Sequence, residues 1–225
     1  GRFLPTWGVV KRALHIGLPM GLQQTIMCSA YVMTTIIIAP LGTFAIAANS
    51  FGVIVESLCY MPGYGIADAA TTLVGQSIGA GRHELMKRFA WLSVGLGVTV
   101  MAVMGVVMYV GAPVAMAMMT PAEEVRRLGV EVLRIEAFAE PMFAAAIVSY
   151  GVFVGAAKTL VPSIMNLVSI WGVRISLAAL LAPSMGLRGV WIAMCIELCF
   201  RGLIFLVKLK FWNIQTSCNH YGKDQ

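Results

Sequence analysis

The chain has 225 residues, of which 59% are hydrophobic and only 12% are charged, with a formal net charge of +6. A soluble domain carries roughly 25% charged residues, so this composition excludes an ordinary soluble fold. No basic patch is interleaved with exposed aromatic residues, which argues against nucleic acid as a partner. The excess of Lys and Arg is instead typical of the loops that orient a membrane protein.

Two long stretches, 13–55 and 89–122, contain no Asp, Glu, Lys or Arg. About 20 apolar residues are enough for a helix to cross a hydrocarbon core of about 30 Å. The sequence therefore predicts an all-α polytopic membrane bundle in which residues 1–225 form one six-helix transmembrane lobe. The expected helices are 13–39, 44–78, 89–110, 122–155, 160–182 and 187–212.

With six spans, both termini and most Lys and Arg residues fall on the same side of the membrane. The positive-inside rule then predicts cytoplasmic termini, and the expected location is the bacterial inner membrane, with lipid as a partner. The chain opens with Gly1 and has no initiator Met, so we expect it to be the middle of a longer sequence.

The five cysteines show no metal-ligand spacing, and their placement in apolar segments indicates small buried side chains. Neither a nucleophile–base pair nor a metal motif is evident, so we expect no enzyme activity, no metal site and no cofactor. The second expected helix contains Pro62, Gly63 and Gly65. A proline bends a helix, and this bend is either a packing kink or a hinge that lines a cavity.

Acidic residues inside membrane segments are costly and mark candidate sites for a coupling ion or proton. Glu56 and Asp68 flank the bend at Pro62, and Glu136 and Glu140 lie four residues apart in the fourth expected helix. Four residues apart means one helix face, where two ionised acids repel each other. Glu140 precedes a proline that frees a backbone carbonyl, so it is the acid expected to matter most in this chain.

Basic groups inside the membrane need partners. Glu197 and Arg201 are four residues apart in the favourable acid-before-base order, so they are predicted to form a structural pair. Arg174 has no acid in its own helix, and its expected partner is Glu140, Glu136 or a helix-end carbonyl. Glu140 is then either an anchor for Arg174 or a proton or cation site.

Polar and aromatic side chains within the spans are candidates for the lining of a cavity, with helix–helix hydrogen bonds as the alternative role. These candidates are Gln23, Gln24, Tyr31, Asn49, Tyr60 and Asn166.

Several motifs resemble the multidrug and toxic compound extrusion (MATE) transporters, and together they cover nearly the whole chain. The fairly specific one is Val74-Gly75-Gln76 followed by Gly79-Ala80-Gly81. The others are Ile16-Gly17-Leu18-Pro19, Ala39-Pro40-Leu41-Gly42, Ala47-Ala48-Asn49, Met61-Pro62-Gly63-Tyr64-Gly65, Glu140-Pro141, Asn166 with Trp171 and Arg174, and Gly189-Val190-Trp191.

The resemblance implies a twelve-helix protein of two lobes, of which this chain looks like the second. It implies export of cationic, often aromatic, drug-like compounds in exchange for H⁺ or Na⁺, with an N-terminal six-helix lobe as the missing partner. One branch of the family has an acid at the position of Met27 and another near Phe143. Because both acids are replaced here, the chain is more similar to the branch whose coupling carboxylates lie in the first lobe.

Two alternatives remain open. A flippase for lipid-linked precursors shares the wider superfamily and uses a basic cavity, for which Arg174 and Arg201 are the available intramembrane bases. A truncated fragment without transport activity is the other.

Overall fold

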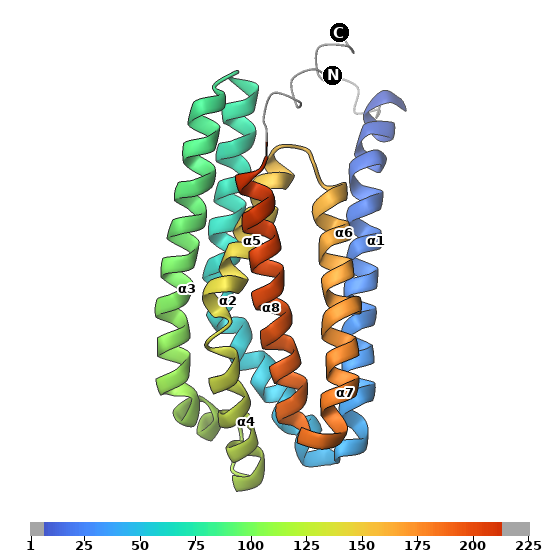
Figure 1. Cartoon of the computed structure of the whole chain (residues 1–225), viewed down its shortest axis with the longest axis vertical. Helices are drawn as coiled ribbons and strands as arrows, with labels where there is room; N and C mark the ends of the chain where they lie inside the picture. The colour runs from blue at the N-terminus through green and yellow to red at the C-terminus, as the bar shows by residue number, and fades with distance from the viewer. Residues whose placement is uncertain (1–6, 213–225) are drawn as a thin grey trace, which may run out of the picture.

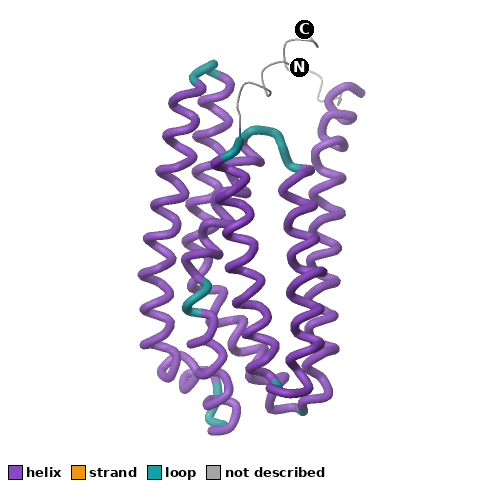
Figure 2. Tube along the Cα trace, in the orientation of Figure 1, coloured by secondary structure: helices purple, strands orange, loops and turns teal. Residues whose placement is uncertain are grey.

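The computed structural model describes residues 7–212, and the regular elements in this range are all helical (Figures 1 and 2). Uncharged apolar segments in a membrane must satisfy every backbone hydrogen bond internally, which a helix does. In chain order the elements are α1 (Trp7–Ile38), η1 (Ala39–Leu41), α2 (Thr43–Gly79), α3 (His83–Met119), α4 (Glu123–Glu136), α5 (Glu140–Gly155), α6 (Leu160–Val168), η2 (Ser169–Ile175), α7 (Ser176–Met185) and α8 (Leu187–Lys210).

Five stretches of the described chain are long and apolar enough to cross a membrane, and α4 and α5 together make a sixth if the bent pair is one span. This confirms the predicted polytopic all-α bundle. The described chain begins and ends at one end of the bundle, and the turns after α2 and α5 lie at that same end (Figure 2). The alternation of loops between the two ends is the one that six spans require.

The helices form two groups that α8 joins. On one side α1 packs against α6, η2 and α7, and on the other α2, α3 and α5 pack together. Helix α8 contacts α5 on one flank and α7 on the other, so it lies between the groups (Figure 1). Direct contact between α1 and α2 is sparse, and the space between the two groups is where a cavity can form.

The prediction of one continuous helix over 122–155 is wrong. This segment is divided at 137–139 into α4 and α5, which meet at 59°. Pro141 lacks an N–H donor and its ring clashes with the carbonyl of residue 137, whereas it fits the first turn of a new helix. The regular spacing that would align Glu136 with Glu140 on one helix face is therefore lost.

Helix α2 continues through Pro62, and Figure 1 shows its lower half crossing the bundle obliquely before its upper half runs nearly parallel to α3. This shape agrees with the bend predicted at the proline. Beside it, a Cβ on Gly63 would meet Met101 Sδ at 2.8 Å, so the glycine lets α3 pack close to the bend. Gly65 faces open space.

Helices α2 and α5 meet at two glycines four residues apart. A Cβ on Gly151 would lie 2.5 Å from the carbonyl oxygen of Ala67, and one on Gly155 would clash with the carbonyl oxygen of Thr71. The hydroxyl of Thr71 donates a hydrogen bond to the carbonyl of Gly151 at 2.9 Å. Small residues at this spacing allow backbones to approach closely, which is a common way to hold membrane helices together.

The predicted pair of Glu197 and Arg201 is present and buried in α8, with Arg201 Nε 3.1 Å from Glu197 Oε1. Ser169 Oγ, on η2, donates a hydrogen bond of 2.6 Å to the same carboxylate oxygen. One carboxylate therefore holds a cation on its own helix and a hydroxyl on the neighbouring helix, which fixes η2 against α8.

We predict that Gly151→Ala destabilises the full-length protein carrying this sequence. The added methyl group would meet the backbone of α2, and overpacking of this kind costs about 1–3 kcal/mol. Thermal unfolding of the purified variant in detergent measures the effect. Gly95→Ala is the control, because a Cβ on Gly95 meets nothing within 4 Å. Equal melting temperatures for the two variants would refute the close packing of α2 and α5.

We also predict that Arg201→Met lowers the melting temperature strongly, because it leaves the carboxylate of Glu197 buried without its charge partner. Breaking a buried pair on one side costs about 3–5 kcal/mol. The double variant Arg201→Met/Glu197→Gln removes both charges and should recover more than half of the loss. A double variant that is less stable than the single one would show that the pair does not act as a unit.

Candidate functional site

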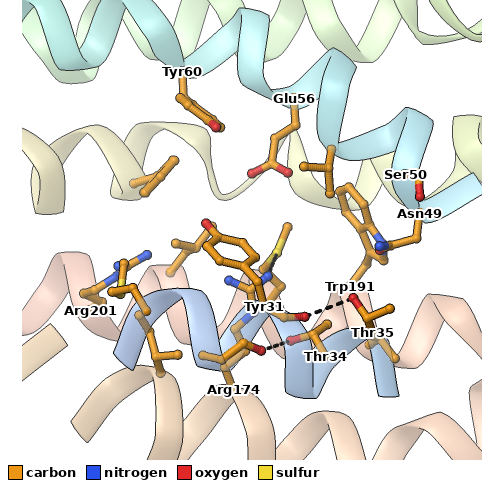
Figure 3. A pocket seen from close by; sticks show the side chains of 18 of the residues that line it. Tyr31, Thr34, Thr35, Asn49, Ser50, Glu56, Tyr60, Arg174, Trp191 and Arg201 are labelled. Carbon is orange, nitrogen blue, oxygen red and sulfur yellow. Dashed lines mark hydrogen bonds between the residues drawn. The ribbon is translucent and has the colours of Figure 1, made fainter. Parts of the chain in front are cut away.

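A cavity of about 260 Å³ lies between the two helix groups (Figure 3). Its wall combines hydroxyl, amide and aromatic side chains with three charged ones. The lining residues come from α1 (Met27, Ala30, Tyr31, Thr34 and Thr35), α2 (Asn49, Ser50, Val53, Glu56, Tyr60 and Tyr64), α5 (Phe143), η2 (Ile170 and Arg174) and α8 (Val190, Trp191, Met194, Leu198 and Arg201).

Glu56 is the one carboxylate among the described residues that line this cavity. Figure 3 shows its side chain pointing from α2 into the space between the two helix groups, with Tyr31 and Tyr60 nearby. The side chain is 7% exposed, so water reaches it mainly through the cavity. A carboxylate in this position is attracted to the guanidinium groups of Arg174 and Arg201 across the cavity.

The predicted pairing of Arg174 with Glu140 or Glu136 is wrong. In the described part of the chain Arg174 forms no ion pair; its guanidinium donates to Met194 Sδ and lies 5.8 Å from the ring centroid of Tyr31. Glu140 instead packs against α3: a Cβ added to Gly105 of that helix would lie 3.3 Å from the Cβ of Glu140. Helix α3 and η2 lie on opposite sides of the bundle, which separates the two side chains (Figure 1).

Glu136 and Glu140 flank the break between α4 and α5, and each is only 1% exposed. Neither carboxylate oxygen of Glu140 has a hydrogen-bond partner within the described residues, and Oε2 of Glu136 has none there either. Carboxyl groups inside a membrane protein are expensive to bury and by default mark functional positions. Both remain candidates for a proton or ion, although neither lines the cavity.

Aromatic rings form much of the cavity wall. The ring of Tyr60 lies edge-on to Tyr64 at 5.6 Å and to Phe143 at 5.7 Å between centroids. Trp191 Nε1 donates a 3.1 Å hydrogen bond to Asn49 Oδ1, which joins α8 to α2. A tryptophan N–H buried in a membrane bundle needs an acceptor, and this requirement was the available signal that Trp191, named from the sequence only as part of a family motif, is also a site residue.

The other predicted site residues lie in different environments. Asp68 is exposed on α2, Gln24 is exposed on α1 and Asn166 is buried in α6; none of them lines the cavity. The side chain of Gln23 lies outside the described part of the structure. Tyr64 and Met194 line the cavity but were not among the predicted cavity residues, because a helix position alone does not tell which face meets the cavity.

Comparison with known proteins identifies the family. The MatE family model matches residues 19–180. A "Probable multidrug resistance protein NorM" from Xylella fastidiosa is 30% identical over 203 residues, which is 89% of this chain and 43% of that protein. Its counterpart from Thermotoga maritima is 27% identical over 208 residues, 90% of this chain and 44% of that protein. The chain thus spans a little under half the length of these relatives.

Solved structures show the same fold. The MATE transporter ClbM in complex with Rb⁺ matches with a TM-score of 0.86 at 23% identity, covering 96% of this chain and 51% of that chain. The bent form of the Vibrio cholerae MATE transporter VcmN matches with a TM-score of 0.85 at 18% identity, covering 92% of this chain and 47% of that chain. With the family model spanning most of the sequence, the chain belongs to the MATE family of membrane transporters.

Proposed function

We propose that this chain is one lobe of a cation-coupled efflux transporter in which the cavity binds aromatic organic cations. The observation that carries the proposal is the position of Glu56, a single carboxylate that faces an aromatic cavity inside a transmembrane bundle. Similarity to proteins named as multidrug resistance proteins supports the same kind of activity.

The wall suits a flat, positively charged substrate. The rings of Tyr31, Tyr60, Tyr64, Phe143 and Trp191 offer π faces to a cation, and Glu56 offers a countercharge. Hydroxyl and amide groups around them supply hydrogen bonds without demanding one fixed ligand shape. Tyr31 and Tyr64 are 55% and 46% exposed, so the cavity wall is open on the side of α1 and α2. A second six-helix lobe would close that side.

Export of the substrate is coupled to uptake of the ion if one carboxylate binds either of them but not both at once. A proton or Na⁺ on Glu56 would remove the charge that attracts the organic cation, so the two ligands would compete and exchange. Glu140 and Glu136 would serve as further acceptors at the helix break. The positions where one branch of the family has acids are Met27 and Phe143, and both line this cavity, which leaves Glu56 as its carboxylate.

The proposed transporter would rock two lobes about a central cavity in the bacterial inner membrane. The distribution of Lys and Arg in the loops supports cytoplasmic termini. The partner in this arrangement is an N-terminal lobe of similar size, since the relatives are about twice as long as this chain.

A flippase for phosphate-bearing lipid precursors is the second candidate. Two observations favour it: Arg174 and Arg201 both reach the cavity wall, and Arg174 has no carboxylate partner among the described residues. Guanidinium groups bind phosphate well. Under this alternative Arg174→Gln would abolish activity, whereas under the efflux proposal the loss of this positive charge should leave export of cations equal or faster.

We predict that Glu56→Gln in the full-length protein reduces ion-driven export of a cationic dye from proteoliposomes at least tenfold, because the amide cannot exchange a cation. The imposed gradient is either H⁺ or Na⁺, and the dye inside is followed by fluorescence. Glu140→Gln, measured alongside, should weaken the dependence of export on the gradient.

Asp68→Asn is the matched control. It removes the same charge from the same helix, but Asp68 is exposed and does not line the cavity. Thermal unfolding establishes that all variants are folded. A folded Glu56→Gln variant that exports the dye at the rate of Asp68→Asn would overturn the role of Glu56.

A further inference from the structure

A second hollow lies on the outer face of the bundle, where α3, α4 and α8 meet. It has a volume of about 330 Å³, and none of its lining residues lines the cavity described above. Apart from one arginine, the side chains around it are apolar or aromatic. The lining residues, which we call the outer groove, are Tyr109, Arg134, Ile135, Phe138, Ile192, Cys195 and Ile196.

The charge of Arg134 has no acidic partner among residues 7–212. Its guanidinium carbon lies 5.2 Å from the ring centroid of Tyr109, and no carboxylate in the described range forms an ion pair with it. The acid one turn earlier, Glu131, is held by Arg188 at 2.6 Å. Phe138 packs edge-on against Tyr109 at 5.8 Å between centroids, and its ring also lines the outer groove.

The depth of the outer groove follows from helix geometry. At about 1.5 Å per residue, α3 is about 55 Å long, and when it is placed with its centre at the membrane midplane it extends roughly 12 Å beyond a hydrocarbon core of about 30 Å on each side. Tyr109 lies ten residues before the end of α3, or about 15 Å. Arg134 lies eleven residues after the start of α4 at the same end of the bundle, or about 16 Å (Figure 1). Both residues therefore lie close to the boundary between hydrocarbon and headgroups.

The outer groove faces the lipid of the membrane. The chain spans a membrane, the outer groove faces away from the cavity, and its rim is exposed: Phe138 is 73% and Ile196 is 45% exposed. An unpaired guanidinium at this depth requires an anion, and the phosphodiester of a phospholipid is the anion present at the boundary. Aromatic side chains at the same level are typical of the membrane interface.

We propose that the outer groove binds one phospholipid, with its phosphodiester on Arg134 and an acyl chain along the apolar wall formed by Ile135, Ile192 and Ile196. An anionic headgroup binds more tightly than a zwitterionic one, because it brings no positive charge to the arginine. The ring of Tyr109 holds the guanidinium in place for the phosphate. The lipid fills the junction of three helices, next to the break between α4 and α5.

Native mass spectrometry of the full-length protein, titrated with dioleoyl phosphatidylglycerol, tests the proposal. We expect Arg134→Gln to lose one tightly bound lipid, with at least tenfold weaker binding at that site. Arg127→Gln is the matched control, since it removes the same charge from an exposed position of the same helix outside the outer groove. Equal lipid occupancy in the two variants would overturn the proposal, including the case in which another part of the protein covers this face.

Two competition experiments test whether both the acyl chains and the phosphate of the lipid are needed for binding. Dioleoylglycerol has the chains without the phosphate and inorganic phosphate has the anion without the chains, so neither should displace the bound phosphatidylglycerol. Displacement by phosphate alone would reduce the site to an adventitious ion only. Ile196→Trp should also weaken lipid binding by filling the outer groove while keeping Arg134. Its control is Val106→Trp, an exposed α3 position outside the outer groove, and equal binding in these two variants would contradict the acyl-chain wall.

Discussion

The cost of placing a charge inside a membrane organises this bundle. Some intramembrane charges have a partner within reach, others lie on the cavity wall, and Glu136 and Glu140 lie buried at the break between α4 and α5. Glu197 forms an ion pair with Arg201 and accepts a hydrogen bond from Ser169, which fixes η2 to α8. Glu56 and Arg174 lack such pairing and instead face the space between the two helix groups. The same constraint therefore determines which side chains hold the bundle together and which are left for a ligand.

Close packing between helices is the second constraint, and it determines where the bundle has room for a cavity. Where Gly151 and Gly155 bring α5 against α2, there is no room for side chains and hence no cavity. Where α1 and α2 make little contact, aromatic side chains line a space instead. The position of the cavity follows from this uneven distribution of small residues. Glycine is needed for a different reason between α7 and α8, where Gly186 has a φ of +62° and alone makes the turn.

The sequence was sufficient to predict the membrane class, the number of spans and the pair in α8, because these depend on hydropathy and on spacing within one helix. It was not sufficient to pair Arg174, since that depends on how η2 and α5 are rotated about their axes. The continuous fourth helix was wrong because Pro141 was expected only to free one carbonyl within a helix, whereas it occupies the first turn of a new one. Of the predicted cavity residues, Tyr31, Asn49 and Tyr60 do line the wall, whereas Asn166 is buried in α6 and does not.

The π-helical turn of η2 has a consequence for how cavities of this kind change over evolution. A π turn closes its hydrogen bonds over one more residue than an α turn, so it is equivalent to a one-residue insertion. In a regular α-helix of 3.6 residues per turn, one inserted residue would rotate everything after it by about 100°, whereas a π turn absorbs the extra residue locally and the helix after it keeps its orientation. Arg174 lies at the end of this turn. Loss of one residue with return to an α turn would therefore leave α7 in register and reorient only the side chains within the turn, Arg174 among them, so a single deletion could change the charge of the cavity wall without any substitution in it.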